Sequence, residues 1–121
     1  MHDLRISGGT VVSVATGEMW PADVLVDGET ITALVAPGSP APARDVVDAS
    51  GLLVVPGFID AHVHVESSML VPATFAQAAL ARGTTTVLAD PHEIVNVAGA
   101  DAMRWMMAEG ARTQQSMFWA V

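Results

Sequence analysis

The stretch PGFIDAHVHVESS, residues Pro56 to Ser68, combines an apolar run with two histidines that are one residue apart. Side chains of a β-strand alternate between its two faces, so His62 and His64 are expected to project from one face, together with Asp60. Pro72, a residue that suits the first turn of a helix, follows closely and places the histidines near the carboxyl end of the strand. Parallel α/β folds carry their active sites at that end. The stretch therefore predicts both a strand and a candidate site.

Strands and helices alternate in the part of the chain that this stretch opens. The residue patterns predict strands over 58–65, 84–90 and 116–121 and helices over 73–82 and 100–109. Strand–helix–strand sequences of these lengths indicate parallel βαβ units in an α/β fold. A complete (β/α)₈ barrel takes roughly 250 residues. We therefore expect the chain to be the N-terminal piece of a longer protein or a truncated product.

The first part of the chain has a different pattern, with short β-rich runs separated by turn residues. Two alternating runs between Ala22 and Val35 flank Asp27-Gly28, a strong hairpin signal. Residues 36–44 contain three prolines and a glycine, as a surface loop does. The sequence thus predicts two domains, an all-β unit over residues 1–55 and an α/β unit over residues 56–121.

Composition narrows the classes of partner. Thirteen acidic residues against five basic ones give a net charge of −8, which argues against binding to nucleic acid or to anionic membrane surfaces. No run of about 18 apolar residues predicts a membrane span, and the start lacks the pattern of a signal peptide. The absence of cysteine excludes disulfides and thiolate metal sites and fits a cytoplasmic protein.

The chemistry of the two histidines suggests a metal site. Neutral imidazoles at His62 and His64 can chelate one divalent cation, and added oxygen ligands would suit zinc, manganese or iron. The next predicted strand ends in ADPHEIVN, so Asp90, His92 and Glu93 are expected on the same rim. Simpler explanations exist for both blocks. A His-x-His pair is common by chance, and acidic residues are favoured at a helix start by capping and by the helix dipole.

Three further polar residues lie beside the histidine pair or at the start of the chain. Glu66 and Ser67 directly follow the histidines, and they are expected either to cap the helix at Pro72 or to line a pocket. Both alternatives remain open. His2, at the second position of the chain, is expected to be a disordered terminal residue.

The motifs resemble a known superfamily. The sequence VVPGFIDAHVH resembles the start of the barrel of the amidohydrolases, in which a small β-sandwich precedes a metal-dependent (β/α)₈ barrel. Two longer blocks, GFIDAHVHVESSML and GTTTVLADPHEIVNVAG, are similar to the adenine deaminase family, whereas dihydroorotases and hydantoinases share only the shorter motif. The resemblance covers essentially the whole chain. It implies N-terminal β-sandwich strands followed by the first βαβαβ units of a truncated TIM-type barrel.

The same resemblance implies a reaction, a cofactor and roles for residues. The reaction is hydrolysis of the purine base adenine to hypoxanthine and ammonia by a metal-activated water. The cofactor is a divalent metal centre, binuclear manganese or iron, with zinc as the alternative. His62 and His64 match metal ligands, and the second block matches the pocket, for substrate contact, proton handling or a further metal: Asp90, His92 and Glu93. Glu66 and Ser67 are assigned to substrate contact or to the support of the ligands.

The chain departs from the family in one respect. The family's remaining ligands, a bridging carboxylate, two histidines and a proton-handling aspartate, belong to later barrel strands, so this chain alone is expected to be inactive. One alternative is another cyclic amidohydrolase, similar to dihydroorotase or hydantoinase. The other is a non-catalytic fragment that self-associates through exposed strands. A homo-oligomer is expected, with no nucleic acid or membrane partner.

Overall fold

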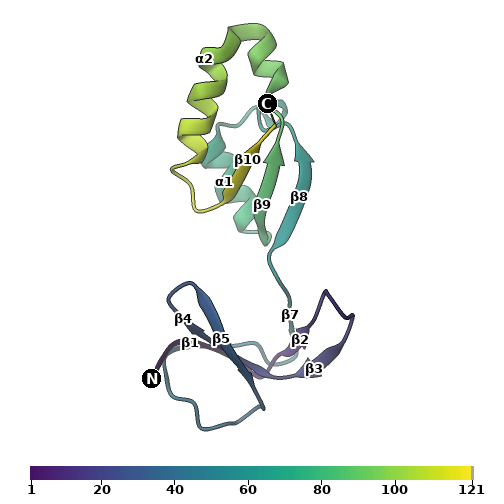
Figure 1. Cartoon of the computed structure of the whole chain (residues 1–121), viewed down its shortest axis with the longest axis vertical. Helices are drawn as coiled ribbons and strands as arrows, with labels where there is room; N and C mark the ends of the chain where they lie inside the picture. Colours follow the sequence, from purple (N-terminus) through teal and green to yellow (C-terminus); the bar gives the residue numbers. More distant parts are fainter. Residues whose placement is uncertain (121) are drawn as a thin grey trace. The chain divides into compact units, whose positions relative to one another are not determined.

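Two units make up the structure, a computed structural model that describes residues 1–120. The first unit comprises Met1–Pro56 and the second begins at Gly57 (Figure 1). Strands alone build the first unit, whereas strands and helices alternate in the second. The chain therefore has a mixed α/β fold.

Two sheets form the first unit, which we call the β-unit. The four-stranded sheet has the order β5-β4-β1-β6, with β1 His2–Ser7, β4 Asp23–Asp27, β5 Thr30–Val35 and β6 Ala43–Asp48. The three-stranded sheet has the order β3-β2-β7, with β2 Thr10–Val12, β3 Met19–Pro21 and β7 Leu53–Val54. The hairpin from β4 to β5 turns at Gly28, whose φ of 57° suits glycine, as the sequence predicts.

Strands of both sheets contribute to one hydrophobic core. Val11 from β2 and Val24 from β4 are buried together with Ala22. Ile6, Trp20, Val26 and Val54 pack around them. Apolar burial of this kind is the main stabilising term in folding, at about 25 cal/mol per Å², and here it joins the two sheets.

A buried ion pair lies in the β-unit. Asp23 is 0% exposed, and Oδ2 of its carboxylate accepts a hydrogen bond of 3.0 Å from Nε of Arg5. Oδ1 accepts a hydrogen bond of 2.8 Å from the backbone N–H of Gly8. The Gly8 hydrogen bond and then Arg5 lower the pKa of Asp23, against the opposing effect of burial. Arg5 also donates to the carbonyls of Ser39 and Ala41, so the pair ties the loop before β6 to β1 and β4.

His2 is ordered, and the prediction of a disordered residue was wrong. His2 begins β1, and its backbone N–H donates to the carbonyl of Pro42 at 2.9 Å. Its Nδ1 lies 2.9 Å from Oδ2 of Asp27. Sheet pairing with β6 on one side and β4 on the other holds the start of the chain. His2 therefore belongs to the scaffold of the β-unit.

The second unit, which we call the α/β unit, is a parallel three-stranded sheet of order β10-β9-β8 with two helices. Its elements are β8 Phe58–Val63, η1 Glu66–Ser68, α1 Pro72–Leu80, β9 Thr84–Ala89, α2 His92–Gly110 and β10 Ser116–Trp119. Pro72 occupies the first turn of α1, as expected. Among the described residues, no helix combines the length and the apolar character that crossing a membrane requires.

Helix α2 begins eight residues earlier than the pattern predicts. It starts at His92 rather than at Ala100, and its backbone is kinked at Gly99, where φ is 73° and ψ is −169°. The residues before the kink include β-branched side chains, which are weak helix formers, so the sequence pattern shows only the second half. Contacts elsewhere in the fold must therefore hold the first half.

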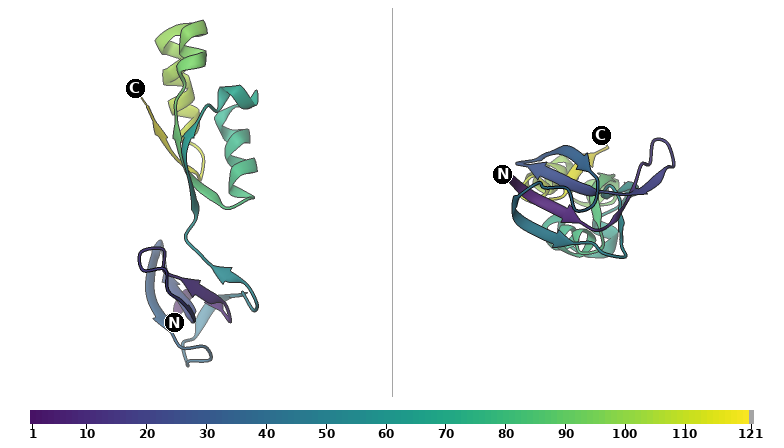
Figure 2. Two further views of the ribbon diagram at one scale, coloured as in Figure 1. Left: turned by 90° about the vertical axis from the view of Figure 1, so that its right-hand side faces the viewer. Right: turned by 90° about the horizontal axis from the view of Figure 1, so that it is seen from below.

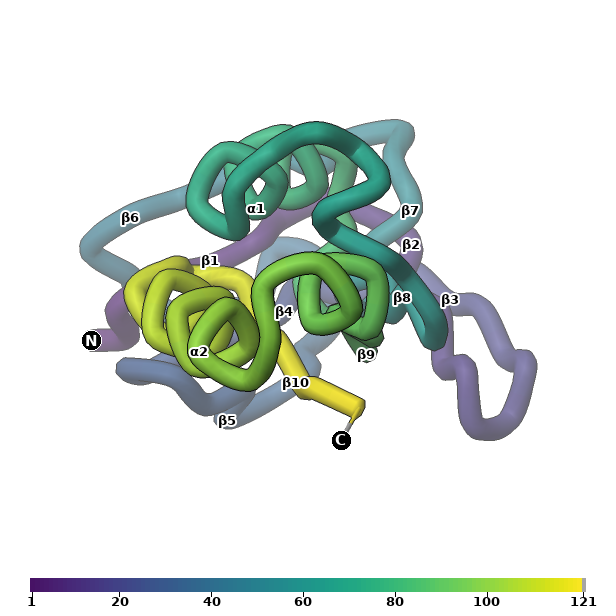
Figure 3. The backbone as a smooth tube through the Cα atoms, turned by 90° about the horizontal axis from the view of Figure 1, so that it is seen from above, coloured from purple at the N-terminus to yellow at the C-terminus, as the bar shows by residue number. Residues whose placement is uncertain are grey.

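The two faces of the parallel sheet differ. Both helices lie on one side of it (Figures 2 and 3), and Ala89 is buried there with Val65 and Met106. On the opposite face Leu88 and its register partner Phe118 are largely exposed. The helices thus cover one face only.

Candidate metal centre

His62 and His64 converge at the carboxyl end of β8. The strand ends at Val63, after a register irregularity between Asp60 and Val63, so His64 lies just beyond the ladder. The two imidazoles meet edge to face, with ring centroids 4.8 Å apart and an interplanar angle of 86°. Their Nε2 atoms are 3.1 Å apart. The structure therefore brings the predicted pair together.

A hydrogen bond at Nδ1 of His64 determines which of its two ring nitrogens carries the proton. Nδ1 lies 2.7 Å from the backbone carbonyl oxygen of Asp90. A carbonyl can only accept, so Nδ1 carries the hydrogen and the Nε2 of a neutral His64 keeps its lone pair. This hydrogen bond, aided by the charges of Asp90, Glu93 and Glu66, raises the pKa of His64 against the effect of desolvation.

The second predicted block lies on the same rim, at the carboxyl end of β9. Nδ1 of His92 is 3.0 Å from Oδ2 of Asp90, and this hydrogen bond is the main cause of the lowered pKa of Asp90. The rings of His64 and His92 are 4.7 Å apart and nearly perpendicular. Two donor groups result, with ligand atoms within 4.8 Å of one another in each: His62, His64 and Asp90, and His64, His92 and Glu93. His64 belongs to both groups.

The first donor group fits a divalent cation. Two imidazole nitrogens that each bind one ion at about 2.1 Å lie roughly 3.0–3.4 Å apart at octahedral to tetrahedral angles, and the Nε2 atoms of His62 and His64 are 3.1 Å apart. The lowered pKa of Asp90 keeps its carboxylate ionised beside them. Nitrogen and carboxylate oxygen together suit zinc, manganese or iron.

Glu66 and Ser67 do not cap α1. That helix is preceded by the apolar Val71, which offers no capping oxygen. Instead, Glu66 Oε1 accepts a hydrogen bond of 3.3 Å from the backbone N–H of Ile94, in the first turn of α2. Ser67 Oγ donates to Oε2 of Glu93 at 2.5 Å. Of the two alternatives left open by the sequence, capping of α1 is therefore excluded, because η1 turns these side chains towards α2.

Two contacts at the site were not evident from the sequence. The carbonyl oxygen of Asp90 orients His64, and a backbone group leaves no signal in residue types. Asp60, which alternation placed beside the histidines, turns back and accepts the backbone N–H of His62 at 3.1 Å. Asp60 belongs to neither of the donor groups found among the described residues.

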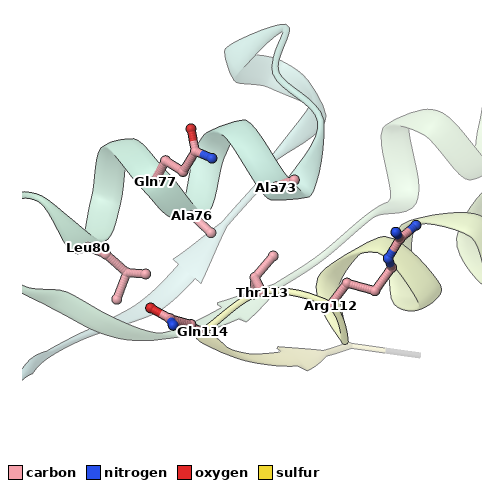
Figure 4. A pocket seen from close by; sticks show the side chains of 7 residues that line it. All are labelled: Ala73, Ala76, Gln77, Leu80, Arg112, Thr113 and Gln114. Carbon is pink, nitrogen blue, oxygen red and sulfur yellow. The ribbon is translucent and has the colours of Figure 1, made fainter.

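The described part of the α/β unit has at least two hollows. One of about 340 Å³ adjoins the rim and is lined by Asp90, Pro91, His92, Val95, Met103 and Ala120. The other, of about 230 Å³, lies between α1 and the segment that leads into β10, with Thr113 at its centre (Figure 4). Arg112 at the second hollow is paired with Glu109 at 3.2 Å. Only the first hollow shares residues with the donor groups.

Comparison with known proteins agrees with this geometry. The model of the amidohydrolase family matches residues 53–119, which is more than half of the chain. The chain belongs to the amidohydrolase family.

Individual proteins that resemble the chain are more specific than the family match. The chain is 52% identical over 108 residues to an adenine deaminase from Deinococcus radiodurans, covering 89% of the chain and 20% of that protein. A solved D-aminoacylase is 34% identical, with a TM-score of 0.62 over 74% of the chain and 18% of that structure. A solved D-hydantoinase from Thermus sp. shares the fold at 24% identity, with a TM-score of 0.71 over 98% of the chain and 27% of that structure. The chain spans about a fifth of the length of the curated relatives it matches.

Proposed function

We propose that the chain is the N-terminal part of an adenine deaminase, in which adenine and water give hypoxanthine and ammonia. The observation that carries the proposal is the similarity to several curated adenine deaminases, which extends over most of the chain. The donor groups on the rim of the sheet support it, because this hydrolysis needs a nucleophile at neutral pH.

The two units suggest how such a protein is organised. We propose that residues 1–55 contribute to a β-sandwich, since two sheets there share one core. Residues 56–121 would begin a (β/α)₈ barrel, since parallel strands alternate with helices that cover one face. In such a barrel the carboxyl ends of the strands carry the catalytic residues, and His62 and His64 lie at that end of β8.

We propose that His62, His64 and Asp90 hold a divalent cation, manganese or iron, with zinc as the alternative. One similar solved structure is that of a D-aminoacylase with a binuclear metal centre, which supports a second ion nearby. The cation would supply a water of lowered pKa as the nucleophile. His64 contributes an oriented lone pair at Nε2, because its Nδ1 proton is held by the carbonyl of Asp90.

His92 is suited to proton handling in this proposal. The ionised carboxylate of Asp90 accepts the hydrogen of His92 Nδ1, which leaves a lone pair on Nε2. That nitrogen can take a proton from a bound reactant or serve as a ligand. The hollow beside His92 is the candidate recess for the purine base. A homo-oligomer and a cytoplasmic location stay predictions.

A chimera tests the proposed function directly. Residues 1–121 would replace the matching segment of the Deinococcus radiodurans adenine deaminase, and adenine loss and ammonia release would be followed with Mn²⁺ present. We expect deamination in the chimera and a loss of about a thousandfold or more in its His62→Ala and His64→Ala variants. Arg104→Ala, an exposed residue paired with Asp101, is the matched control and should stay within about twofold of the parent chimera.

Two results would contradict the proposal. A folded chimera that hydrolyses dihydroorotate or hydantoin while adenine is inert would point to another cyclic amidohydrolase. Full deaminase activity in the His64→Ala chimera would remove His64 from the metal centre.

A further inference from the structure

The first turn of α2 depends on groups outside the helix. This turn carries His92 and Glu93, and the first four N–H groups of any helix have no partner within it. The residue at the N-cap is Pro91, whose side chain has no oxygen to accept them. The kink at Gly99 also separates this turn from the half of α2 that contains the buried Met106. Packing of Ile94 against the cluster of Val65, Ala89 and Met106 fixes part of its position, and acceptors for its N–H groups must come from outside the helix.

Two carboxylates supply acceptors for two of these N–H groups. Asp90 Oδ1 accepts the backbone N–H of His92 at 3.2 Å, and Glu66 Oε1 accepts that of Ile94 at 3.3 Å. A negative charge at a helix N-terminus is also favoured by the helix dipole. Asp90 directly precedes the helix, whereas Glu66 comes from η1, after β8. Glu66 is therefore a capping residue that comes from the segment after β8.

Ser67 makes the second connection between the same two segments. Its Oγ lies 2.5 Å from Oε2 of Glu93, and the hydroxyl donates because a carboxylate only accepts. The contact orients the carboxylate of Glu93, which belongs to the donor group with His64 and His92. Glu66 thus binds the backbone of α2, and Ser67 binds Glu93, a candidate metal ligand on the same helix.

Glu66 itself has one unfavourable contact environment in this arrangement. Its Oε2 is buried and has no hydrogen-bond partner among residues Met1 to Ala120. A buried polar atom without a partner is destabilising. The carboxylate is therefore placed where α2 needs an acceptor rather than where both of its own oxygens are satisfied.

Resting on the proposed metal centre, we propose that Glu66 and Ser67 are positioning residues that clamp the start of α2 to the loop after His64. The clamp acts together with Asp90, which binds the backbone N–H and the Nδ1 of His92, to keep His92 and Glu93 against His64. Neither residue needs to touch the substrate or the cation.

Amide hydrogen exchange of the chain tests the clamp without any metal. Glu66→Ala removes the acceptor, and we expect the Ile94 amide to exchange about five- to tenfold faster. Glu66→Gln keeps a side-chain oxygen at that place and should retain most of the protection. Asp101→Ala, an exposed acid in the second half of α2, is the matched control and should leave Ile94 unchanged. Unchanged exchange in Glu66→Ala, or equal loss in Glu66→Gln, would overturn the clamp.

Metal affinity tests its consequence for the site. In Zn²⁺ titrations of a His62→Ala background, in which only the second donor group keeps its histidines, we expect Glu66→Ala and Ser67→Ala to weaken binding by about tenfold and by a few-fold, respectively, and Glu66→Gln to restore most of it. Affinity equal to that of the background in both alanine variants would overturn the positioning role. If the parent chain binds no Zn²⁺ or Mn²⁺, the proposed metal centre is wrong, while the exchange of the Ile94 amide still decides whether the clamp exists.

Discussion

The buried ion pair in the β-unit and the histidine cluster of the α/β unit both consist of ionisable side chains. The two clusters nevertheless have different roles. Asp23 is fully buried, and the hydrogen bonds to its two carboxylate oxygens come from Arg5 and the backbone of Gly8. On the rim of the α/β unit, His62 and His64 direct nitrogen atoms at one another across 3.1 Å. The first cluster is complete without a further group, whereas the second gathers donors suited to a cation.

This difference shows how a structural cluster can be told from a binding site. A charge that is paired and hydrogen-bonded inside the fold contributes to stability or to specificity of the fold. Ring nitrogens that converge at the exposed carboxyl ends of the strands contribute to neither, and they favour a cation instead. Changes in the first cluster should alter stability, and changes in the second should alter metal affinity.

Removal of Arg5 should have the largest effect on stability. Arg5→Ala leaves the carboxylate of Asp23 buried beside an empty space, and we expect unfolding of the β-unit to become easier by about 3–5 kcal/mol. Hydrogen exchange of the β4 amides in increasing urea measures this change. Arg44→Ala, which breaks an exposed pair with Asp3, is the control and should have no measurable effect. A similar result for both arginines would remove the distinction between buried and exposed pairs.

His64→Ala should have the largest effect on metal binding, because His64 belongs to both donor groups. We expect the affinity for Zn²⁺ to fall by about 100-fold or more, and to fall less in His92→Ala. Calorimetric titration of the three proteins provides the comparison, and the β4 exchange rates should not change. Equal losses for His64 and His92 would show that the two groups do not share a ligand.

Replacement of Gly99 in α2 should have an effect of intermediate size on stability. Its φ of 73° and ψ of −169° lie in a region that is essentially confined to glycine. Gly99→Ala should therefore lower stability by about 1–3 kcal/mol, as measured by urea unfolding of the α/β unit. Gly17→Ala, another residue with positive φ but in the β-unit, controls for glycine replacement in general. No change in Gly99→Ala would mean that α2 can straighten without cost.

Acid should destabilise the β-unit through Asp23, in a smaller and graded way. The pKa of folded Asp23 is lowered by the Gly8 hydrogen bond and by Arg5, so its contribution to stability is complete above the unfolded value of about 3.9. The contribution is lost as the pH falls through the lowered pKa of the folded state. Circular dichroism between pH 2 and 6 should show a shallower acid transition in Asp23→Asn than in the parent.

Much of the fold follows from local residue patterns, and the exceptions have physical causes. The alternation after Pro56 predicts the parallel sheet, and Pro72 predicts the start of α1. The first half of α2 was missed because tertiary contacts, among them the Glu66 cap and the packing of Ile94, hold residues of low helix propensity. His2 was missed because its order comes from pairing with strands that are distant in the sequence.

The site shows the same limit. Convergence of His62 and His64 follows from strand geometry, and the arrival of His92 follows from the order of parallel strands. The protonated nitrogen of His64 could not be predicted, since it depends on a backbone carbonyl from β9's end. Contacts that involve side-chain type leave a trace in the sequence, whereas contacts to the backbone do not.

The single free lone pair of His64 has a consequence for stoichiometry. Nδ1 is committed to the carbonyl of Asp90, so only Nε2 can coordinate, and one lone pair serves one ion at a time. The two donor groups therefore compete for the same atom and are mutually exclusive. Cations that use His64 should saturate at one equivalent per chain, and a second equivalent would have to bind without His64.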